Sequence, residues 1–260
     1  MALETTRRGT TLGSLKLEPG YKRVANAIEE QILAGHIKTG ELLPTETELA
    51  DILGVHRSTV REGIRALENS GLVQRGAGMR LKVCVPEVSA IGSQIARALG
   101  LRQVSFFELW EMQMLLEPFA AGHAASRITD SLAKELKRNV AELRDNLEDD
   151  DLVVRNDTEF HQLIAEAAGN SALSLSSAPI GALLFSATVN LYSAVPQARH
   201  RLLKSHESIL EAVVAHDRQT AELWMTRHIQ DFHRGYTLLG ADMNAPIQLD
   251  PRAVDFLRLA

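Results

Sequence analysis

The amino-acid sequence predicts a mainly α-helical protein that combines a small N-terminal unit, containing one strand hairpin, with an all-α antiparallel bundle. The chain has 260 residues, and a chain of this length usually forms two domains rather than one core. Apolar residues recur at helical spacing through most of the chain, and the alternation typical of strands is confined to residues 71–83. These three observations give the fold class.

Composition limits the class of protein. Hydrophobic residues make up 45% of the chain and charged residues 23%, which is typical of a soluble globular protein. The sequence has no run of about 18 uninterrupted apolar residues, and its first twenty residues lack the apolar core of a signal peptide. We therefore expect a cytoplasmic protein that does not bind a membrane. The single cysteine, Cys84, has no partner for an intramolecular disulfide and is interpreted as a small buried apolar residue.

Charge is distributed unevenly along the chain. Residues 1–85 carry 12 Lys and Arg against 10 Asp and Glu, or +2, and residues 86–260 carry 16 against 23, or −7. This division favours a polyanion-binding head on an acidic body. A difference of this size also arises by chance in many chains, so the assignment of a polyanion-binding head depends on the sequence motifs.

The head begins with two helices. The segment YKRVANAIEEQILAG has apolar residues at helical spacing, and Gly35 ends it. In TETELADILG, Thr45 and Glu48 form a capping box, and the helix ends at Gly54. The residues expected on the buried sides are Val24, Ala27, Ile28, Ile32, Leu33, Leu49, Ile52 and Leu53.

A third helix follows a tight turn at Gly54 and Val55. It runs from about Arg57 to Ser70 and buries Val60, Ile64 and Leu67 at positions i, i+4 and i+7, so its polar residues face outward or toward its N-terminus. These polar residues are Arg57, Ser58, Thr59, Arg61 and Arg65. Two helices joined by such a turn form a helix-turn-helix.

The strand hairpin GLVQRGAGMRLKV completes a winged helix. It turns around Gly76, Ala77 and Gly78. In a winged helix that binds DNA, Arg75, Gly76 and Arg80 would lie at or near the second contact, beside the contact made by the third helix. The free N–H groups and positive dipole end of the third helix can hold phosphates, while its side chains reach base edges in the major groove. The alternative is that these arginines form a solvated helix face that binds no partner. The order of helix cap, turn and wing favours DNA binding over this alternative.

The second half of the chain contains only helical patterns after a short linker marked by Pro86. Helices are expected over residues 105–127, 130–150, 152–168, 172–192, 198–216 and 218–238. The first of these has Phe107, Leu109, Met112, Leu115 and Leu116 on one apolar side. Asp130 is expected to cap the second. The body is therefore expected to be an antiparallel bundle of six or seven helices.

Four residues of this half form a pattern typical of metal ligands. Asp157 and His161 are separated by one helical turn and can reach one ion, although the pair alone also fits a cap or a simple hydrogen bond. His206 and His228 lie among apolar residues of two later helices, where an unpaired polar group costs about 1–3 kcal/mol. A shared metal ion would satisfy all three imidazoles. The other histidines, interpreted as structural or solvated, are His36, His123, His200, His216 and His233.

The segment ELLPTETELADILGVHRSTVREGIRALENSGLVQRGAG resembles the DNA-binding domain of the GntR family of bacterial transcription regulators, whose members read like LPSERELAxxLGVSRTPVREALxxLxxxGLV. The residues that the resemblance implies as DNA-reading are Arg57, Ser58, Thr59 and Arg61. Two positions depart from the family pattern. Thr47 replaces an arginine that often contacts DNA, which weakens one expected contact. His56 replaces a capping Ser or Thr, so base preference shifts or Ser58 takes over the cap.

Four later segments, ELWEMQMLLEPFAAGHAAS, DTEFHQLIAEAAGN, HESILEAVVAHD and AELWMTRHI, resemble the FCD effector domain of the FadR-type branch of this family. Members with a metal site take an Asp and a His from DxxxH and one His from each of two later helices. The resemblance implies that Asp157, His161, His206 and His228 bind one divalent ion, Zn or Ni, with a small carboxylate or water completing the shell. Gln113 replaces an arginine that often pairs with the effector carboxylate. The effector is then less acidic than usual, or another side chain holds it.

Two functions fit these features. The first is a ligand-responsive transcription regulator, expected to repress by binding a pseudo-palindromic double-stranded DNA operator as a homodimer. The second is a metal-dependent enzyme with an accessory DNA-binding domain, which needs a general base beside the metal. Glu159 and Glu207 are nearest in sequence, but each faces away from its neighbouring ligand. The sequence therefore favours the regulator, and no residue is predicted to be catalytic.

The expected divisions of the chain are a tail at 1–18, the winged helix-turn-helix at 19–84, a linker at 85–90, the FCD-like effector domain at 91–239 and a tail at 240–260.

Overall fold

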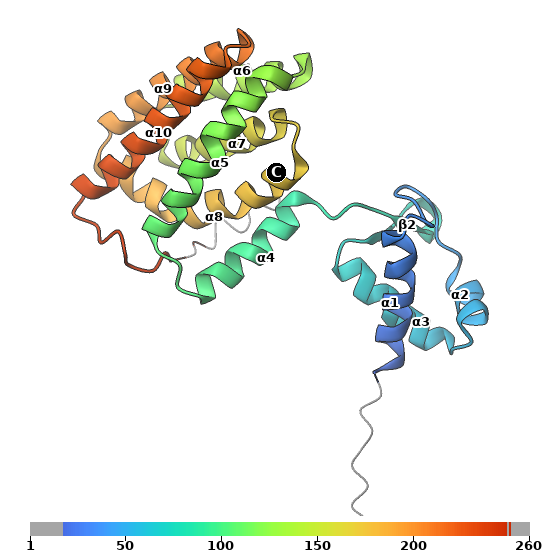
Figure 1. Ribbon diagram of the computed structural model, residues 1–260. Coiled ribbons are helices and arrows are strands. Elements are labelled where there is room, and N and C mark those ends of the chain that lie inside the picture. Colours follow the sequence, from blue (N-terminus) through green and yellow to red (C-terminus); the bar gives the residue numbers. More distant parts are fainter. Residues whose placement is uncertain (1–17, 249, 251–260) are drawn as a thin grey trace, which may run out of the picture. The chain divides into compact units, whose positions relative to one another are not determined.

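The computed structural model describes residues 18–248 and residue 250, and within them the chain forms ten α-helices, one 3₁₀ helix and two strands. The chain divides between Pro86 and Glu87 into two compact units. Figure 1 labels most of the helices and one strand of these units. The prediction of a mainly helical fold is confirmed.

The first unit is a winged helix. Its elements are α1 (Gly20–Leu33), α2 (Glu46–Leu53), α3 (Arg57–Asn69), β1 (Val73–Arg75), η1 (Ala77–Met79) and β2 (Leu81–Val83). Thr45 and Glu48 form the capping box of α2, and Gly54 ends that helix in the left-handed conformation with φ 63°. The strands are antiparallel, with Val73 opposite Val83.

The core of this unit lies between the three helices and the hairpin. Its buried side chains are Val24, Ile28, Leu43, Leu49, Val60, Ile64, Leu67, Val73, Leu81 and Val83. Gly63 lets α1 and α3 approach closely, because a Cβ there would lie 2.8 Å from the Val24 side chain and 2.9 Å from the Tyr21 carbonyl oxygen.

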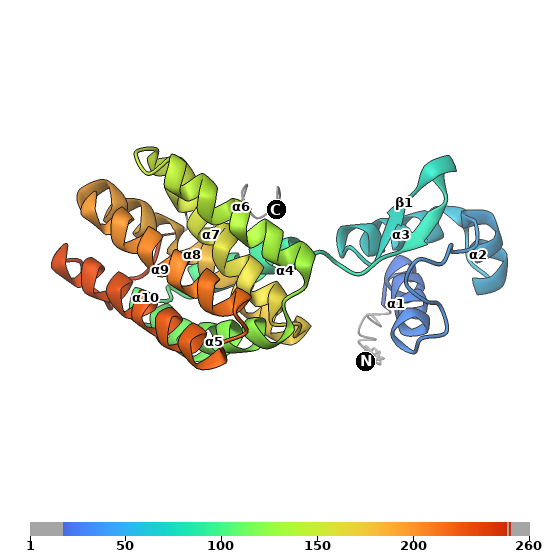
Figure 2. The same ribbon diagram turned by 90° about the horizontal axis from the view of Figure 1, so that it is seen from above.

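The second unit is an all-α bundle. Its helices are α4 (Val88–Leu101), α5 (Phe106–Arg127), α6 (Asp130–Asp145), α7 (Asp150–Ala167), α8 (Ser171–Ala194), α9 (Gln197–Val214) and α10 (Arg218–Leu238). Helices α5 and α10 lie side by side in Figures 1 and 2. They run antiparallel, since Phe106 stacks on Tyr236 at one end and Gly122 faces Glu222 at the other.

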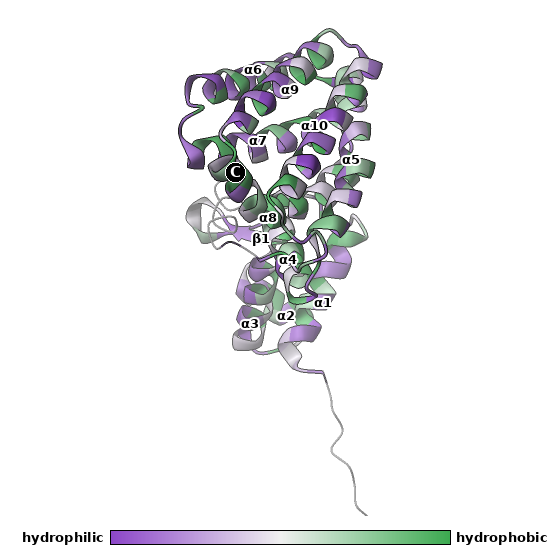
Figure 3. Cartoon of the chain, turned by 90° about the vertical axis from the view of Figure 1, so that its left-hand side faces the viewer, coloured by the Kyte–Doolittle hydropathy of each residue, from purple (hydrophilic) through white to green (hydrophobic). Residues whose placement is uncertain are grey.

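Two apolar clusters fill the bundle. One is centred on α8 and includes Leu183, Phe185 and Leu191, and the other joins α5, α6, α7, α9 and α10. Figure 3 shows hydrophilic and hydrophobic residues side by side along α5, α6 and α9, as amphipathic helices require. Among the described residues, α8 alone is long and apolar enough to cross a membrane, but 56% of that stretch is buried inside the bundle. The burial identifies α8 as a core helix.

Several local expectations differ from the structure. Helix α4 begins at Val88, inside the segment expected to be a linker, because no proline follows Pro86 before that helix ends at Leu101. Thr129 caps α6 in place of Asp130, since its hydroxyl accepts a hydrogen bond from the Leu132 N–H. Cys84 is half-buried rather than buried.

Some apolar side chains expected inside are exposed. They are Leu33, Ile52, Phe107, Met112 and Leu115. On α5 the reason is specific, because the inward face carries the polar residues Gln113 and Glu117 between Leu109 and Ala120. A search for apolar spacing alone therefore selects a face that is rotated away from the true one.

The beginning of the segment predicted as a C-terminal tail packs on the bundle. The Ile247 N–H donates to the Val104 carbonyl at 2.8 Å, the Phe107 N–H donates to the Met243 carbonyl at 3.0 Å, and Ile247 is buried. The rest of that predicted tail, residues 249 and 251–260, lies outside the described residues.

Candidate DNA interface and metal centre

The predicted DNA-reading residues lie on α3 and at its N-cap, on the wing and, for Thr47, on α2. Most of them are exposed: Thr47, His56, Arg57, Ser58, Arg61, Arg65, Arg75 and Gly76. Thr59 is only half-exposed and faces Gly20 of α1. His56 is the N-cap residue of α3, and its side chain makes no capping hydrogen bond. The N-terminal N–H groups of α3 are therefore not capped by that side chain and suit a phosphate.

Three of these arginines converge on one carboxylate. Glu46, the first residue of α2, accepts from Arg61 Nη2 at 3.1 Å, from Arg57 Nε at 3.4 Å and from Arg75 Nη2 at 3.3 Å. The Arg75 Nε also pairs with Glu68 at 2.9 Å. Helix α3 and the wing are thus joined through side chains of opposite charge.

Asp157, His161, His206 and His228 come together inside the second unit. Helix α7 supplies Asp157 and His161 one turn apart, α9 supplies His206 and α10 supplies His228. One ligand atom of each lies within 4.8 Å of the others. His206 is fully buried and stacks on Phe160 with the ring centroids 3.7 Å apart, which fixes the plane of its imidazole.

The separations of these atoms suit a single small cation. The Asp157 Oδ1 lies 3.3 Å from His206 Nε2, 3.6 Å from His161 Nε2 and 3.9 Å from His228 Nε2, and the last two nitrogens are 3.1 Å apart. Four ligands placed tetrahedrally about 2.0–2.1 Å from zinc lie roughly 3.4 Å from one another. The cluster therefore needs only small adjustments to hold such an ion.

Unpaired polar atoms in the cluster support this fit. The Asp157 Oδ1 and the His206 Nε2 are buried and lie 3.3 Å from each other, but neither makes a hydrogen bond of normal geometry in the described chain. Burying such atoms without a partner costs about 1–3 kcal/mol each, and a cation that both atoms bind removes that cost. The donor set of imidazoles and one carboxylate is a set that Zn and Ni accept.

The electrostatics of the cluster also favour a cation. Burial lowers the pKa of His206 and, aided by the two neighbouring imidazoles, lowers that of His228 well below its ordinary value, so both imidazoles are neutral and able to bind a cation. Against the effect of burial, the imidazoles of His161 and His206 hold the pKa of the Asp157 carboxyl below its usual range. Burial also opposes the charged form of His161, but Glu117 and Asp157 raise its pKa to about 10. The cluster therefore stabilises a positive charge, and an ion that binds the His161 Nε2 displaces a proton from it.

Glu117 is a functional candidate that the sequence did not reveal. It is 7% exposed, its Oε2 contacts His161 Nδ1, and its Oε1 accepts a hydrogen bond from Gln113 Nε2 at 3.1 Å. Gln113, the expected effector contact, is also buried, and its Oε1 has no hydrogen-bond partner in the described chain. A glutamate four residues after a glutamine on α5 carries no signal that it meets a histidine on α7.

The two carboxylates considered as enzyme bases are engaged elsewhere. Glu159 accepts a hydrogen bond from Asn139 Nδ2 at 3.0 Å, and Glu207 accepts one from Arg144 Nη2 at 2.9 Å.

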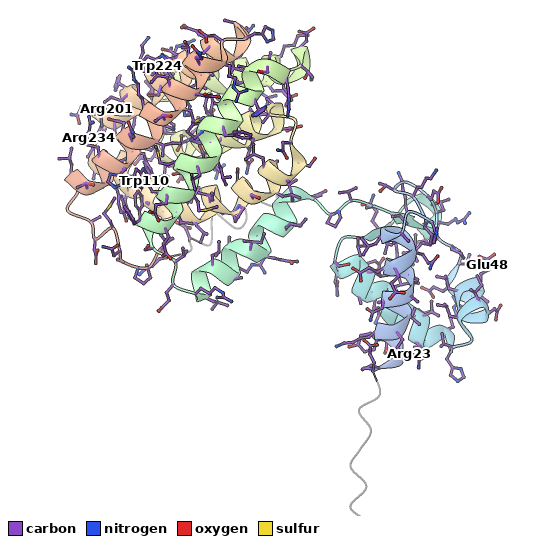
Figure 4. The ribbon with its side chains drawn as sticks, in the orientation of Figure 1. Arg23, Glu48, Trp110, Arg201, Trp224 and Arg234 are labelled. Atoms are coloured by element: carbon purple, nitrogen blue, oxygen red, sulfur yellow. The ribbon has the colours of Figure 1, made fainter. Side chains whose placement is uncertain are left out.

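The five histidines interpreted as structural or solvated are not members of the cluster. One of them, His233, packs against the Trp110 ring at a centroid distance of 4.4 Å, where α5 meets α10 (Figure 4).

Both units resemble known protein families. Residues 20–83 match the bacterial regulatory proteins of the gntR family, and residues 108–231 match the FCD domain. The HTH-type transcriptional repressor NanR of Salmonella newport is 30% identical over 258 residues, which cover 89% of this chain and 93% of that protein. NanR of Enterobacter sp. is 28% identical, with 87% and 91% covered.

A solved structure, the GntR protein of Streptococcus agalactiae, is 27% identical, with a TM-score of 0.59 and coverage of 82% of this chain and 99% of that chain. The matched family consists of transcription regulators, so the prediction that the protein is not an enzyme is confirmed. With a gntR head, an FCD body and a relative that is 30% identical over most of both chains, this protein belongs to the GntR family of bacterial transcription regulators.

Proposed function

We propose that the protein is a metal-containing repressor that binds a pseudo-palindromic operator as a homodimer and responds to a small-molecule effector. The convergence of Asp157, His161, His206 and His228 inside the effector domain of a DNA-binding regulator carries this proposal. One recognition helix covers only a few base pairs, so two heads on neighbouring half-sites give useful specificity. A repressor acts on chromosomal DNA, which places the protein in the cytoplasm.

The proposed metal is Zn or Ni. His206 and His228 are neutral imidazoles, Asp157 contributes a carboxylate oxygen, and His161 contributes Nε2. Four protein ligands leave room for an added ligand when the coordination number rises above four. When bound, the ion supplies an electrophilic position for a carboxylate oxygen of the effector.

Gln113 suggests which further group the effector carries. Its amide nitrogen is engaged by Glu117, while its buried carbonyl oxygen has no donor. An arginine at this position would favour a second carboxylate, but a free carbonyl oxygen favours a hydrogen-bond donor. The effector class is therefore a small carboxylate that also carries a hydroxyl or amino group.

We expect effector and operator to change each other's affinity by the same factor. An effector shifts the DNA-competent population only if it prefers one state of the protein, and linkage makes the effect reciprocal, typically about 5–150-fold. A panel of small carboxylates with and without hydroxyl or amino groups is titrated into the Zn-loaded protein by calorimetry. The compound that binds best is titrated again with operator DNA present. Equal affinities in the two titrations would contradict the proposed response.

A further inference from the structure

Glu46 occupies a position from which one carboxylate organises both parts of the DNA interface. Arg57 and Arg61 extend from the recognition helix α3, and Arg75 extends from β1 of the wing. All three guanidinium groups lie within 3.4 Å of a Glu46 oxygen, and no two of the arginines are adjacent in sequence. The contact therefore exists only because the fold brings α2, α3 and the wing together.

The Glu46 side chain is well placed to hold these groups. It is only 13% exposed, whereas Arg57 and Arg61 are 61% and 48% exposed. Its backbone is fixed because it follows the capping residue Thr45 at the start of α2. Burial acts to raise its pKa, but the Arg61 and Arg75 guanidinium groups outweigh that effect and lower it, so the carboxylate stays charged.

The charges do not cancel. Three arginines share Glu46, and Arg75 also pairs with Glu68, so three positive charges meet two negative ones. The remaining positive charge stays available for DNA phosphates. A free arginine side chain loses rotamer entropy when it is immobilised. Arginines already held by a carboxylate lose less of that freedom when they bind.

We propose that Glu46 is a specificity-determining positioning residue, which fixes Arg57, Arg61 and Arg75 as one unit for base contacts and disfavours DNA that offers only phosphates. The carboxylate repels phosphates of any sequence, and correctly placed bases alone offset this repulsion through bidentate arginine contacts. The inference rests on the proposed DNA interface and deepens it. The proposal predicts that loss of the Glu46 charge lowers specificity. Charge alone predicts no such loss, because removing a negative charge near DNA ordinarily strengthens binding to any sequence.

The test compares Glu46→Gln with Glu62→Gln, which removes the same charge from an exposed position on α3. Two duplexes are used at one salt concentration: a site enriched by the wild-type protein from a random duplex pool, and a scrambled duplex of equal composition. Both variants should bind the scrambled duplex more tightly by a similar factor. Only Glu46→Gln should lose about tenfold in the ratio of site affinity to scrambled affinity, the effect of one lost contact of about 1.4 kcal/mol.

The outcomes are separable. A ratio that changes equally in the two variants would overturn the role of Glu46. A wild-type protein that enriches no sequence would instead contradict the proposed DNA interface itself. Glu46→Ala keeps a strong helix former at the start of α2 and is measured in parallel, with circular dichroism on every variant. A folded Glu46→Ala protein with an unchanged ratio would overturn the proposal equally.

The imidazole of His161 links the proposed metal centre to Glu117. The Nε2 of His161 faces the cluster, 3.1 Å from His228 Nε2, and its opposite nitrogen Nδ1 contacts Glu117 Oε2. Gln113 holds the other carboxylate oxygen at 3.1 Å. Glu117 is not among the four convergent ligands. Metal-bound histidines commonly donate their second N–H to a carboxylate, which fixes the ring and its tautomer.

The geometry points to Glu117 as a positioning residue that orients His161 for the metal, with Gln113 fixing the carboxylate in turn. Glu117→Gln keeps the shape and a carbonyl acceptor but removes the charge. We expect Zn²⁺ and Ni²⁺ affinity, measured by competition with a chelating dye, to fall about 10–100-fold. The unfolding midpoint in excess chelator is measured for each variant, and metal affinities are compared only well below it, which separates positioning from general stability.

The matched control is Glu111→Gln, an exposed glutamate on the same helix, which should bind metal as the wild type does. Equal metal affinity in Glu117→Gln and wild type would overturn the role of Glu117. A wild-type protein that binds neither ion would contradict the metal centre, which is a different failure. Glu117→Asp is the second variant, and it should retain more affinity than Glu117→Gln because it keeps the negative charge.

Discussion

Replacing His206 and His228 together with alanine is expected to abolish stoichiometric binding of Zn²⁺ or Ni²⁺ and to remove the effector response. The variant keeps only Asp157 and His161, both on α7, so an ion no longer joins three helices. Metal binding free energy appears as stability of the state that binds. Added metal should therefore raise the unfolding midpoint of the wild-type bundle but not that of the variant. Metal content by mass spectrometry and calorimetric unfolding check both parts.

The control for this variant is His200→Ala with His233→Ala, which also removes one histidine from α9 and one from α10. Neither residue belongs to the convergent cluster, so metal content should stay at one ion per chain. The winged helix is a separate compact unit, and its operator binding in the absence of effector should survive in both proteins. Stoichiometric metal and a normal effector response in the His206 and His228 variant would mean that these histidines are ordinary core residues.

The fold of the head could be predicted from local sequence because its elements end where short-range chemistry requires it. The Thr45 and Glu48 capping box begins α2, and Gly54 ends it in a conformation that glycine adopts without strain. Apolar spacing in α3 also identified the buried residues Val60, Ile64 and Leu67. Each of these features depends on residues within a few positions of one another.

The bundle was harder to predict in detail because its inner faces are partly polar. Helix α5 buries Gln113 and Glu117 and leaves Leu115 exposed, so apolar spacing gave the helix but not its orientation. The four convergent residues could be chosen from their types and spacing. Glu117 could not, because its partner His161 is on another helix and nothing local links them. The same reason hid Glu46, whose bond to Arg75 spans 29 residues.

Replacing Arg57 and Arg61 together with alanine is expected to remove specific operator binding. Both side chains are exposed on the N-terminal half of α3, where side chains reach base edges in the major groove. A bidentate arginine contact to a guanine contributes about 1–3 kcal/mol. The proposed dimer would lose each contact twice, so even one true base contact per head would weaken binding by about 2–6 kcal/mol, or roughly 30-fold to more than 10⁴-fold.

The single variants distinguish the kind of contact that each arginine makes. An arginine that reads a base should lose affinity mainly for the enriched site, whereas one that holds a phosphate should lose it on all sequences and reduce the salt dependence. Arg138→Ala, which alters an exposed arginine on α6, controls for the change in net charge. Fluorescence anisotropy measures the wild type and the four variants on the enriched site and on the scrambled duplex, at one salt concentration for the affinities and over a salt series for the slope. If neither single variant nor the double variant binds the enriched site more weakly than Arg138→Ala, α3 is not the recognition helix in the proposed sense. The Glu46 contacts would then be surface ion pairs, which contribute little on their own.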